Sequence, residues 1–314
     1  MELIHGLHNL RRRHRGCVAT IGNFDGVHLG HQAVLGQLAE RGAELGLPTV
    51  VITFEPHPRE FFARGEVPPR LTRFREKLQA LRRFSVARVV CLRFNQALAS
   101  MPAAAFIRSL LVEGLAVRYL VVGDDFRFGK GREGDFAMLS AAGNEHGFKV
   151  AAMHTFNVDG LRVSSTRIRE ALARDELATA EKLLGRPYRM CGRVVHGDER
   201  GRSIGFPTAN IHLHRHGSPL GGVYAVEVFG LEKEPLAGVA NVGTRPTLGG
   251  TESRLEVHLL DFDADIYGRY MHVDFLHKLR PEQRFDSLEE LVAQISKDAA
   301  NARVFHEARR AGVQ

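Results

Sequence analysis

Two histidines three residues apart, His28 and His31, follow an apolar run and open a helical pattern. The turn between the run and the histidines, residues 22–27, begins with Gly22, Asn23, Phe24 and Asp25. A spacing of three places both imidazoles on one face of a helix, and the free N–H groups at a helix N-terminus favour an anion. We therefore predict a phosphate site here. The alternative is a surface turn with incidental histidines, which the rarity of the whole His-x-Gly-His pattern disfavours.

A glycine-rich segment in the second half, residues 201–210, could also bind phosphate through its backbone N–H groups. Its candidate ATP-binding residues are Gly201, Ser203, Gly205, Pro207, Thr208 and Asn210. Alternate residues of an extended chain point the same way, so the oxygens of Thr208 and Asn210 can face one ligand. Neutral oxygens suit a Mg²⁺ ion that is shared with substrate phosphates. The alternative is a flexible loop with a buried threonine.

Three polar segments of the first half are weaker candidates. They contain Asp125, Phe126 and Phe128; Ser165, Thr166 and Arg169; and Glu55, Pro56, His57 and Pro58. Aromatic faces can stack on planar rings, and hydroxyls followed by arginine can bind phosphate. The alternatives are an apolar-anchored loop, a helix N-cap and a stiff proline turn. A G-x-G-x-x-G pattern at residues 129–134 does not directly follow a strand, which disfavours a dinucleotide fingerprint.

One carboxylate of the second half stands out. Glu256 and His258 alternate with apolar residues and therefore share one face of a predicted strand. A carboxylate within reach of a hydroxyl could act as a general base, although a carboxylate on such a face is usually only solvated. Residues 241–247, which include Arg245, read as a turn on sequence alone.

The composition favours small-molecule partners. The length of 314 residues predicts two domains, and the net charge of +7 fits polyphosphates as well as nucleic acid or plain solubility. Without tryptophan there is no evident base-stacking platform, so we expect no nucleic-acid partner. No apolar run approaches the roughly 20 residues that span a bilayer, and the N-terminus lacks a signal-peptide core. We expect a cytoplasmic protein with no membrane partner, and three scattered cysteines predict neither a metal site nor disulfides.

The apolar patterns change character near residue 185, which predicts domains at 1–185 and 186–314. Strands expected in the first domain, alternating with helices, are 18–21, 49–54, 89–92, 119–122 and 150–154. Such alternation predicts a parallel sheet with helices on both faces. Strands expected in the second are 189–196, 223–229, 236–242, 255–260 and 270–277, which read as an antiparallel barrel or sandwich. We expect Asp175 to cap the helix that ends at Leu184, and Asp286 with Glu289 to cap a C-terminal helix.

The motifs resemble those of two enzyme families. The His-x-Gly-His turn resembles the signature of the nucleotidyltransferase superfamily, and the surrounding residues 22–28 resemble its flavin adenylyltransferase branch. The segment Gly205-Phe-Pro-Thr-Ala-Asn210 resembles a motif of riboflavin kinases. Their order matches the prokaryotic bifunctional riboflavin kinase/FAD synthetase family. That resemblance implies an α/β nucleotidyltransferase-type doubly wound parallel sheet, followed by a small antiparallel β-barrel domain with a C-terminal helix.

The resemblance also implies an activity for each half. The C-terminal half is expected to phosphorylate riboflavin to FMN with ATP and Mg²⁺, and the N-terminal half to join AMP to FMN, giving FAD and pyrophosphate. Ser165, Thr166 and Arg169 would grip the ATP phosphates, residues 53–58 would line the flavin side, and Glu256 would be the kinase base. Some family members carry Asp at position 55 and Asn at position 125, so the roles of Glu55, Asp125 and Arg245 stay open. A single-activity enzyme, a non-catalytic binding module and any oligomeric state also stay open.

Overall fold

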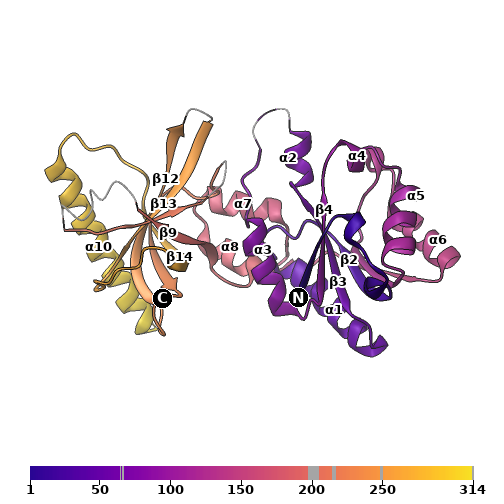
Figure 1. The fold of residues 1–314 in the computed structure, drawn as a ribbon. Coiled ribbons are helices and arrows are strands. Elements are labelled where there is room, and N and C mark those ends of the chain that lie inside the picture. The colour runs from indigo at the N-terminus through magenta and orange to yellow at the C-terminus, as the bar shows by residue number, and fades with distance from the viewer. Residues whose placement is uncertain (64, 66, 197–204, 214–216, 248–249, 313–314) are drawn as a thin grey trace. The chain divides into compact units, whose positions relative to one another are not determined.

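The computed structural model describes residues 1–63, 65, 67–196, 205–213, 217–247 and 250–312, and its contacts divide the chain into two units (Figure 1). One unit comprises Met1–Val67 and Thr72–Ser164, and the other comprises Pro68–Leu71 and Ser165–Gln314. Helices α7 (Ser165–Ala173) and α8 (Leu177–Leu184) group with the second unit. The domain boundary near residue 185 stays a prediction.

The first unit is built on a six-stranded sheet in which all neighbouring strands are parallel, as predicted. Its strands are β1 (Glu2–His5), β2 (Cys17–Ile21), β3 (Thr49–Glu55), β4 (Arg88–Arg93), β5 (Val117–Gly123) and β6 (Lys149–Met153), in the order β1-β4-β3-β2-β5-β6. The strand order reverses between β2 and β5. Ligands of open parallel sheets bind at such a switch point, beyond the carboxyl ends of the strands.

Helices surround this sheet. They are α1 (Leu29–Leu45), α2 (Pro58–Phe62), α3 (Phe74–Leu81), α4 (Gln96–Ala99), α5 (Ala103–Phe106) and α6 (Phe136–His146), with a π-helical segment at Ile107–Gly114. Short 3-10 turns lie at Leu7–Asn9, Arg12–His14, Arg82–Phe84 and Lys130–Arg132, and a small hairpin pairs β7 (Asn157–Val158) with β8 (Leu161–Arg162). Of the glycines of the 129–134 pattern, Gly129 precedes the short Lys130–Arg132 turn, Gly131 lies within it and Gly134 follows it, so the pattern does not open a long helix.

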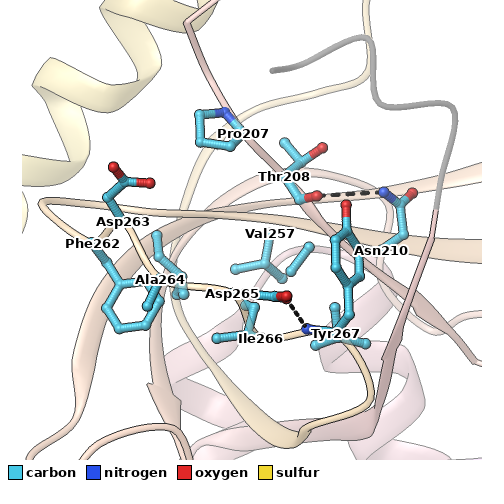
Figure 2. A pocket seen from close by; sticks show the side chains of 13 residues that line it. Pro207, Thr208, Asn210, Val257, Phe262, Asp263, Ala264, Asp265, Ile266 and Tyr267 are labelled. Atoms are coloured by element: carbon cyan, nitrogen blue, oxygen red, sulfur yellow. Dashed lines mark hydrogen bonds between the residues drawn. The ribbon is translucent and has the colours of Figure 1, made fainter.

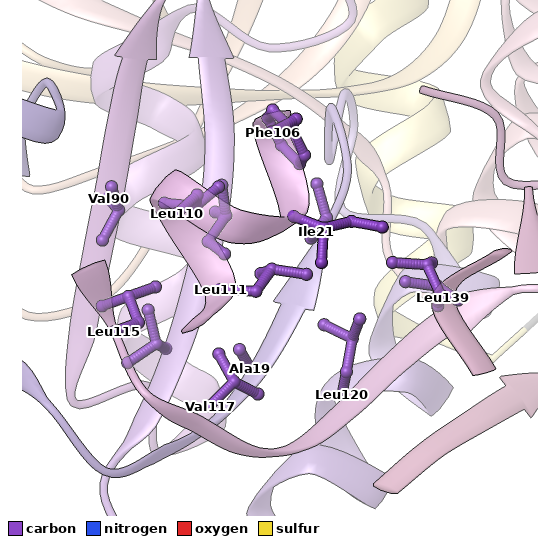
Figure 3. Close-up of a cluster of buried hydrophobic side chains, with 14 of the residues drawn as sticks. Ala19, Ile21, Val90, Phe106, Leu110, Leu111, Leu115, Val117, Leu120 and Leu139 are labelled. Carbon is purple, nitrogen blue, oxygen red and sulfur yellow. The ribbon is translucent and has the colours of Figure 1, made fainter. Parts of the chain in front are cut away.

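Two hydrophobic cores form because alternate residues of each strand face opposite sides of the sheet. Ala19 and Ile21 of β2 pack with Phe106 of α5 and Leu139 of α6, and Figure 3 shows this cluster from close by. Val18, the residue before Ala19, belongs to the other core, which is formed with side chains of α1 and α3. Helices on both faces confirm the doubly wound class.

The second unit contains a closed antiparallel barrel, which confirms the predicted strand-rich half. Its strands are β9 (Tyr188–Val195), β10 (Ala209–His212), β11 (Gly222–Phe229), β12 (Leu236–Thr247), β13 (Gly250–Leu259) and β14 (Tyr270–Arg280), in the order β10-β13-β12-β11-β14-β9. The C-terminal helix α10 (Leu288–Arg310) lies against the barrel through Ala299 and Ala302, which pack on Ala225 and Leu260. Within the described residues, no helix is both long enough and apolar enough to cross a bilayer.

Both predicted helix caps were wrong. Asp175 has φ 62°, and its carboxylate accepts hydrogen bonds from Tyr224 Oη at 3.0 Å and Lys278 Nζ at 2.7 Å, so α8 begins after Glu176 without a side-chain cap. The cap of α10 is Ser287, one residue after Asp286, and its Oγ accepts from the N–H of Glu290 at 3.2 Å.

Candidate active sites

The two predicted histidines lie together at the end of β2. His28 is the N-cap of α1, and its Nδ1 accepts a hydrogen bond from the backbone N–H of His31 at 3.3 Å. Because Nδ1 is an acceptor, a neutral His28 carries its proton on Nε2. The two rings stack with centroids 3.6 Å apart and planes 15° apart. Both imidazoles therefore stand over the helix N-terminus, as the spacing predicted.

His31 is held in a neutral state. Burial lowers its pKa well below the usual value, and the charges of His28 and Lys77 lower it further. Its Nδ1 is buried and has no hydrogen-bond partner among the described residues, and the ring of Phe24 packs against it at 4.9 Å. A neutral imidazole at a helix N-terminus can donate a hydrogen bond to an anion, and a bound polyphosphate would favour protonation of His31.

The remaining residues of the turn shape it in different ways. Asn23 Oδ1 is buried without a partner among the described residues, as is Thr20 Oγ1 on β2. Unpaired buried polar atoms are costly, so their concentration at this sheet edge indicates a place for ligand or water. Asp25 instead accepts from Thr72, from its N–H at 2.9 Å and its hydroxyl at 3.2 Å. Gly22 makes room for Phe24, since a Cβ at position 22 would lie 3.1 Å from that ring.

The loop after β5, on the other side of the switch point, contains the predicted flavin residues 125–128. Phe128 is buried in the core against Phe106, at a ring distance of 5.6 Å, and Phe126 stacks on it at 5.5 Å. Asp125 is exposed and forms an ion pair with Arg162 of β8 at 2.5 Å. Of the predicted residues here, Phe126 and Asp125 are therefore the ones at the surface.

The segment after β3 carries an aromatic group that the sequence analysis missed. His57 is the N-cap of α2, and its Nδ1 accepts a hydrogen bond from the N–H of Arg59 at 3.1 Å. Pro56 precedes this cap, and Pro58 is the first residue of the helix. The group contains Phe54, Phe61, Phe62 and Phe94. Phe62 is 61% exposed, which is unusual for a large apolar side chain next to a candidate site. The adjacent pair Phe61-Phe62 was the available sequence signal.

The residues of the Ser165–Arg169 segment that we predict to bind the ATP phosphates belong to the second unit. Ser165 and Thr166 are the first residues of α7, and Arg169 lies one turn later. Nε of Arg169 donates to the carbonyl of Pro69 at 2.7 Å, and Pro69 also belongs to this unit. Their part in ATP binding stays a prediction.

In the barrel, Glu256 stands in a row of polar side chains. It lies opposite Asn210 of β10 on one side and opposite Asn241 of β12 on the other. Directly paired residues of antiparallel strands present their side chains on the same face, with Cβ atoms about 4.5–5.5 Å apart. Two amides therefore flank the carboxylate, and one of them is the predicted Mg²⁺ residue.

Two cavities lie near this row. One, of about 300 Å³, is lined by Glu256, Asn241 and His258 of the barrel and by side chains of α10. The other, of about 160 Å³, is lined by Asn210 and by the 262–267 loop, and Figure 2 shows it from close by. Thr208 lines both cavities. It therefore lies where a group could pass from one to the other.

The loop that carries Thr208 is fixed by a residue without an assigned role. His258 Nδ1 donates to the carbonyl of Pro207 at 2.9 Å, which anchors the loop on β13. Asn210 Nδ2 makes a long 3.5 Å contact to the carbonyl of Thr208, which leaves its Oδ1 free to ligate. Gly205 has φ +84° in the same loop. Gly201 and Ser203 lie outside the described residues, as does the side chain of Arg245.

The donor set suits one kind of metal ion. Among the described residues no three His, Cys, Asp or Glu side chains gather as a metal cage. A hydroxyl and an amide oxygen, from Thr208 and Asn210, are instead neutral ligands beside the smaller cavity. Mg²⁺ is commonly held in this way, by few protein oxygens together with water and substrate phosphates.

Comparisons with known proteins agree with this geometry. Residues 10–167 match the sequence model of the FAD synthetase family, and residues 184–306 match that of riboflavin kinase. A bifunctional riboflavin kinase/FMN adenylyltransferase of Escherichia coli K12 is 56% identical over 306 residues, covering 97% of this chain and 98% of that protein. The Haemophilus influenzae enzyme of the same description is 51% identical over 305 residues, covering 97% and 99%.

A solved structure shares the whole architecture. A crystal structure described as a macrolide-efflux protein from Streptococcus pneumoniae has a TM-score of 0.81 and 31% identity, covering 96% of this chain and 99% of that chain. The sequence matches span nearly the full length and include both halves in the predicted order. The chain therefore belongs to the bifunctional riboflavin kinase/FMN adenylyltransferase family, with its FAD synthetase domain in the N-terminal half and its riboflavin kinase domain in the C-terminal half.

Proposed function

We propose that the barrel transfers the γ-phosphoryl group of ATP to the 5′-hydroxyl of riboflavin at the junction of its two cavities. The position of Thr208, which lines both, carries this proposal. Riboflavin occupies the 300 Å³ cavity, because Glu256 lines it, and ATP occupies the 160 Å³ cavity, which Pro207, Thr208 and Asn210 line.

In this arrangement Glu256 acts as the general base. The ribityl 5′-hydroxyl is neutral, so its oxygen becomes a better nucleophile as the carboxylate accepts its proton. That oxygen bonds to the γ-phosphorus while the bond from γ-phosphorus to the β-γ bridging oxygen breaks, giving FMN and ADP. Thr208 and Asn210 would hold Mg²⁺, which neutralises phosphate charge when it is bound.

The N-terminal domain catalyses a transfer that needs no base. The phosphate of FMN is already anionic, and its oxygen attacks the α-phosphorus of ATP while the bond to the α-β bridging oxygen breaks and pyrophosphate leaves. His28, His31 and the N–H groups of the 22–28 turn donate to the phosphates, where positioning and charge stabilisation supply most of the catalysis. The family resemblance also gives Ser165, Thr166 and Arg169 a role in ATP binding.

The flavin of this second reaction lies against the aromatic side chains near the switch point. Phe62 is an exposed ring beside Pro56, His57 and Pro58, and an exposed ring can stack on an isoalloxazine. Across the switch point, Phe126 offers a second apolar surface, which Phe128 supports from below. Asp125 contributes a polar edge, and the partners of the whole enzyme are ATP, riboflavin, FMN and FAD.

The kinase assignment is tested with Glu256→Gln. Loss of the base should lower kcat for riboflavin phosphorylation by about 10²–10⁴-fold, while FAD formation from supplied FMN is unchanged. Glu232→Gln, at an exposed position in the turn between β11 and β12, is the matched control. Riboflavin phosphorylation by Glu256→Gln at the rate of this control would refute the assignment.

The adenylyltransferase assignment is tested with His28→Asn. Asparagine caps helices well, so the variant keeps the start of α1 but loses the imidazole. FAD formation should fall about 100-fold or more, with riboflavin phosphorylation intact. Normal pyrophosphate release from ATP and FMN in this variant and in His31→Asn would show that the triphosphate binds elsewhere.

A further inference from the structure

One buried cation of the N-terminal domain has no place in the mechanism so far. Lys77 of α3 is only 3% exposed, whereas lysines are almost never fully buried unless a charge or a polar site receives them. Its neighbours on α3, Leu78 and Leu81, pack into the hydrophobic core below α1. The ammonium group is therefore inside the domain, where its charge is weakly screened.

The contacts of this ammonium lead to the proposed phosphate site. Lys77 Nζ donates to Thr53 Oγ1 at 3.5 Å, and Thr53 Oγ1 donates in turn to the backbone carbonyl of Asn23 at 3.4 Å. Thr53 is fully buried near the carboxyl end of β3. The cation is thus two hydrogen bonds away from the turn that follows β2, at the sheet edge where Asn23 Oδ1 and Thr20 Oγ1 have no described partner.

The effect of the charge on neighbouring groups locates it independently. Lys77 is one of the causes that lower the pKa of His31, after burial and His28. Burial and the charge of Glu55 raise the pKa of Cys91 to about 11, and the charge of Lys77 opposes this rise. The ammonium therefore acts on His31, in the first turn of α1, and on Cys91, in the second half of β4.

We propose that Lys77 is a positioning residue of adenylyl transfer, whose buried charge draws the triphosphate onto the 22–28 turn and favours pyrophosphate as the leaving group. The inference rests on the proposed placement of the triphosphate at this turn. Beside the imidazoles of His28 and His31, the Lys77 ammonium supplies a positive charge to the triphosphate without being exposed to solvent. A purely structural role, such as balancing Glu55, would affect folding but not the response to polyphosphates.

The experiment compares Lys77→Met with Lys77→Arg in the full chain. Methionine keeps the length and apolar stem but removes the charge, and arginine keeps the charge. We expect Lys77→Met to lower kcat/KM for ATP in FAD formation by about 10- to 100-fold, as loss of a unit charge acting over several ångströms in a poorly screened site implies. Product inhibition of Lys77→Met by inorganic pyrophosphate should weaken by a similar factor. For Lys77→Arg, kcat/KM for ATP should stay within about threefold of the wild-type value. Riboflavin phosphorylation should be unchanged in both variants.

Lys149→Met, at an exposed position of the same domain, is the control for loss of one positive charge. If Lys77→Met has the wild-type kcat/KM for ATP and the wild-type inhibition by pyrophosphate while His28→Asn is inactive, the inference about Lys77 is wrong and the proposed site stands. The same responses with His28→Asn also active would instead refute the proposed site. If Lys77→Met does not fold, as far-ultraviolet circular dichroism would show, Lys77→Gln against Lys77→Arg gives the same comparison, with pyrophosphate binding measured by calorimetry.

Discussion

Removing the carboxylate of Asp298 should destabilise the barrel, because the guanidinium of Arg280 would lose its buried partner. Arg280 Nε donates to the two carboxylate oxygens at 3.1 and 2.9 Å, and Gln294 donates to one of them at 2.8 Å. The charged side chains are only 17% and 5% exposed. The pair joins β14 to α10, and both residues line the 300 Å³ cavity.

The size of the effect follows from the burial of the pair. Removing one partner of a buried ion pair costs about 3–5 kcal/mol. The lower value applies here, because Arg280 retains some contact with solvent, donates to the carbonyl of Pro281 and lies over the ring of Phe285. For a unit of about 150 residues, a loss of about 3 kcal/mol lowers the melting temperature by roughly 6–12 °C.

Tyrosine fluorescence can follow this unfolding separately. The chain has no tryptophan, and four of its five tyrosines, all but Tyr119, lie in the second unit. The control is Arg303→Ala on α10, which breaks an exposed ion pair with Asp261 and should leave the transition in place. If Asp298→Ala shifts the melting temperature no more than Arg303→Ala does, the Arg280 charge is not buried as described and the reasoning is wrong.

Two further outcomes follow from single side chains. His258→Ala should raise KM for Mg²⁺-ATP in the kinase reaction several-fold, because the Pro207 carbonyl loses its hydrogen-bond donor. His258→Asn can donate from a similar position and should restore the KM. Steady-state kinetics at fixed riboflavin measures both values, and an unchanged KM in His258→Ala would contradict the anchoring role. Burial lowers the pKa of His306 on α10 below its usual value, so the unfolded chain binds a proton first and stability falls as the pH drops below about 6.5. Urea unfolding of wild type and His306→Gln between pH 5 and 7.5 should show a shallower pH dependence in the variant, and equal slopes would exclude His306 as the cause.

The fold was largely predictable because its signals are local. Alternating and continuous apolar runs located ten strands, and the parallel sheet and the barrel follow from how those runs alternate with helices. The first strand was missed, since Glu2–His5 is short and becomes a strand by pairing with β4 at the sheet edge. The caps failed for a related reason: the carboxylate of Asp175 is taken by Tyr224 and Lys278, which are distant in sequence.

The candidate sites show the same division. Residues clustered in sequence, such as His28 with His31 and Thr208 with Asn210, could be found from spacing alone. Lys77 could not, because it is one of 43 basic residues and only the fold places it under the ends of the strands. Phe128 is the opposite case: its polar neighbours in sequence suggested that it contacts a ligand, whereas its side chain packs into the core.

The two candidate sites differ in charge, and each charge suits the nucleophile of its reaction. This difference favours the release of FMN from the kinase site and its binding at the adenylyltransferase site. Around the riboflavin cavity the described lining includes three carboxylates, from Glu256, Glu282 and Asp298, and one guanidinium, from Arg280. Neutral riboflavin enters such a cavity without electrostatic cost, but FMN carries a new anionic phosphate next to Glu256, and like charges at close range repel. The nucleotide site of the N-terminal domain has the opposite character, with imidazoles, a helix N-terminus and the buried charge of Lys77. On the placements proposed above, phosphorylation turns a good ligand of the kinase site into a poor one, and an oxygen of the new phosphate is the nucleophile of the second reaction.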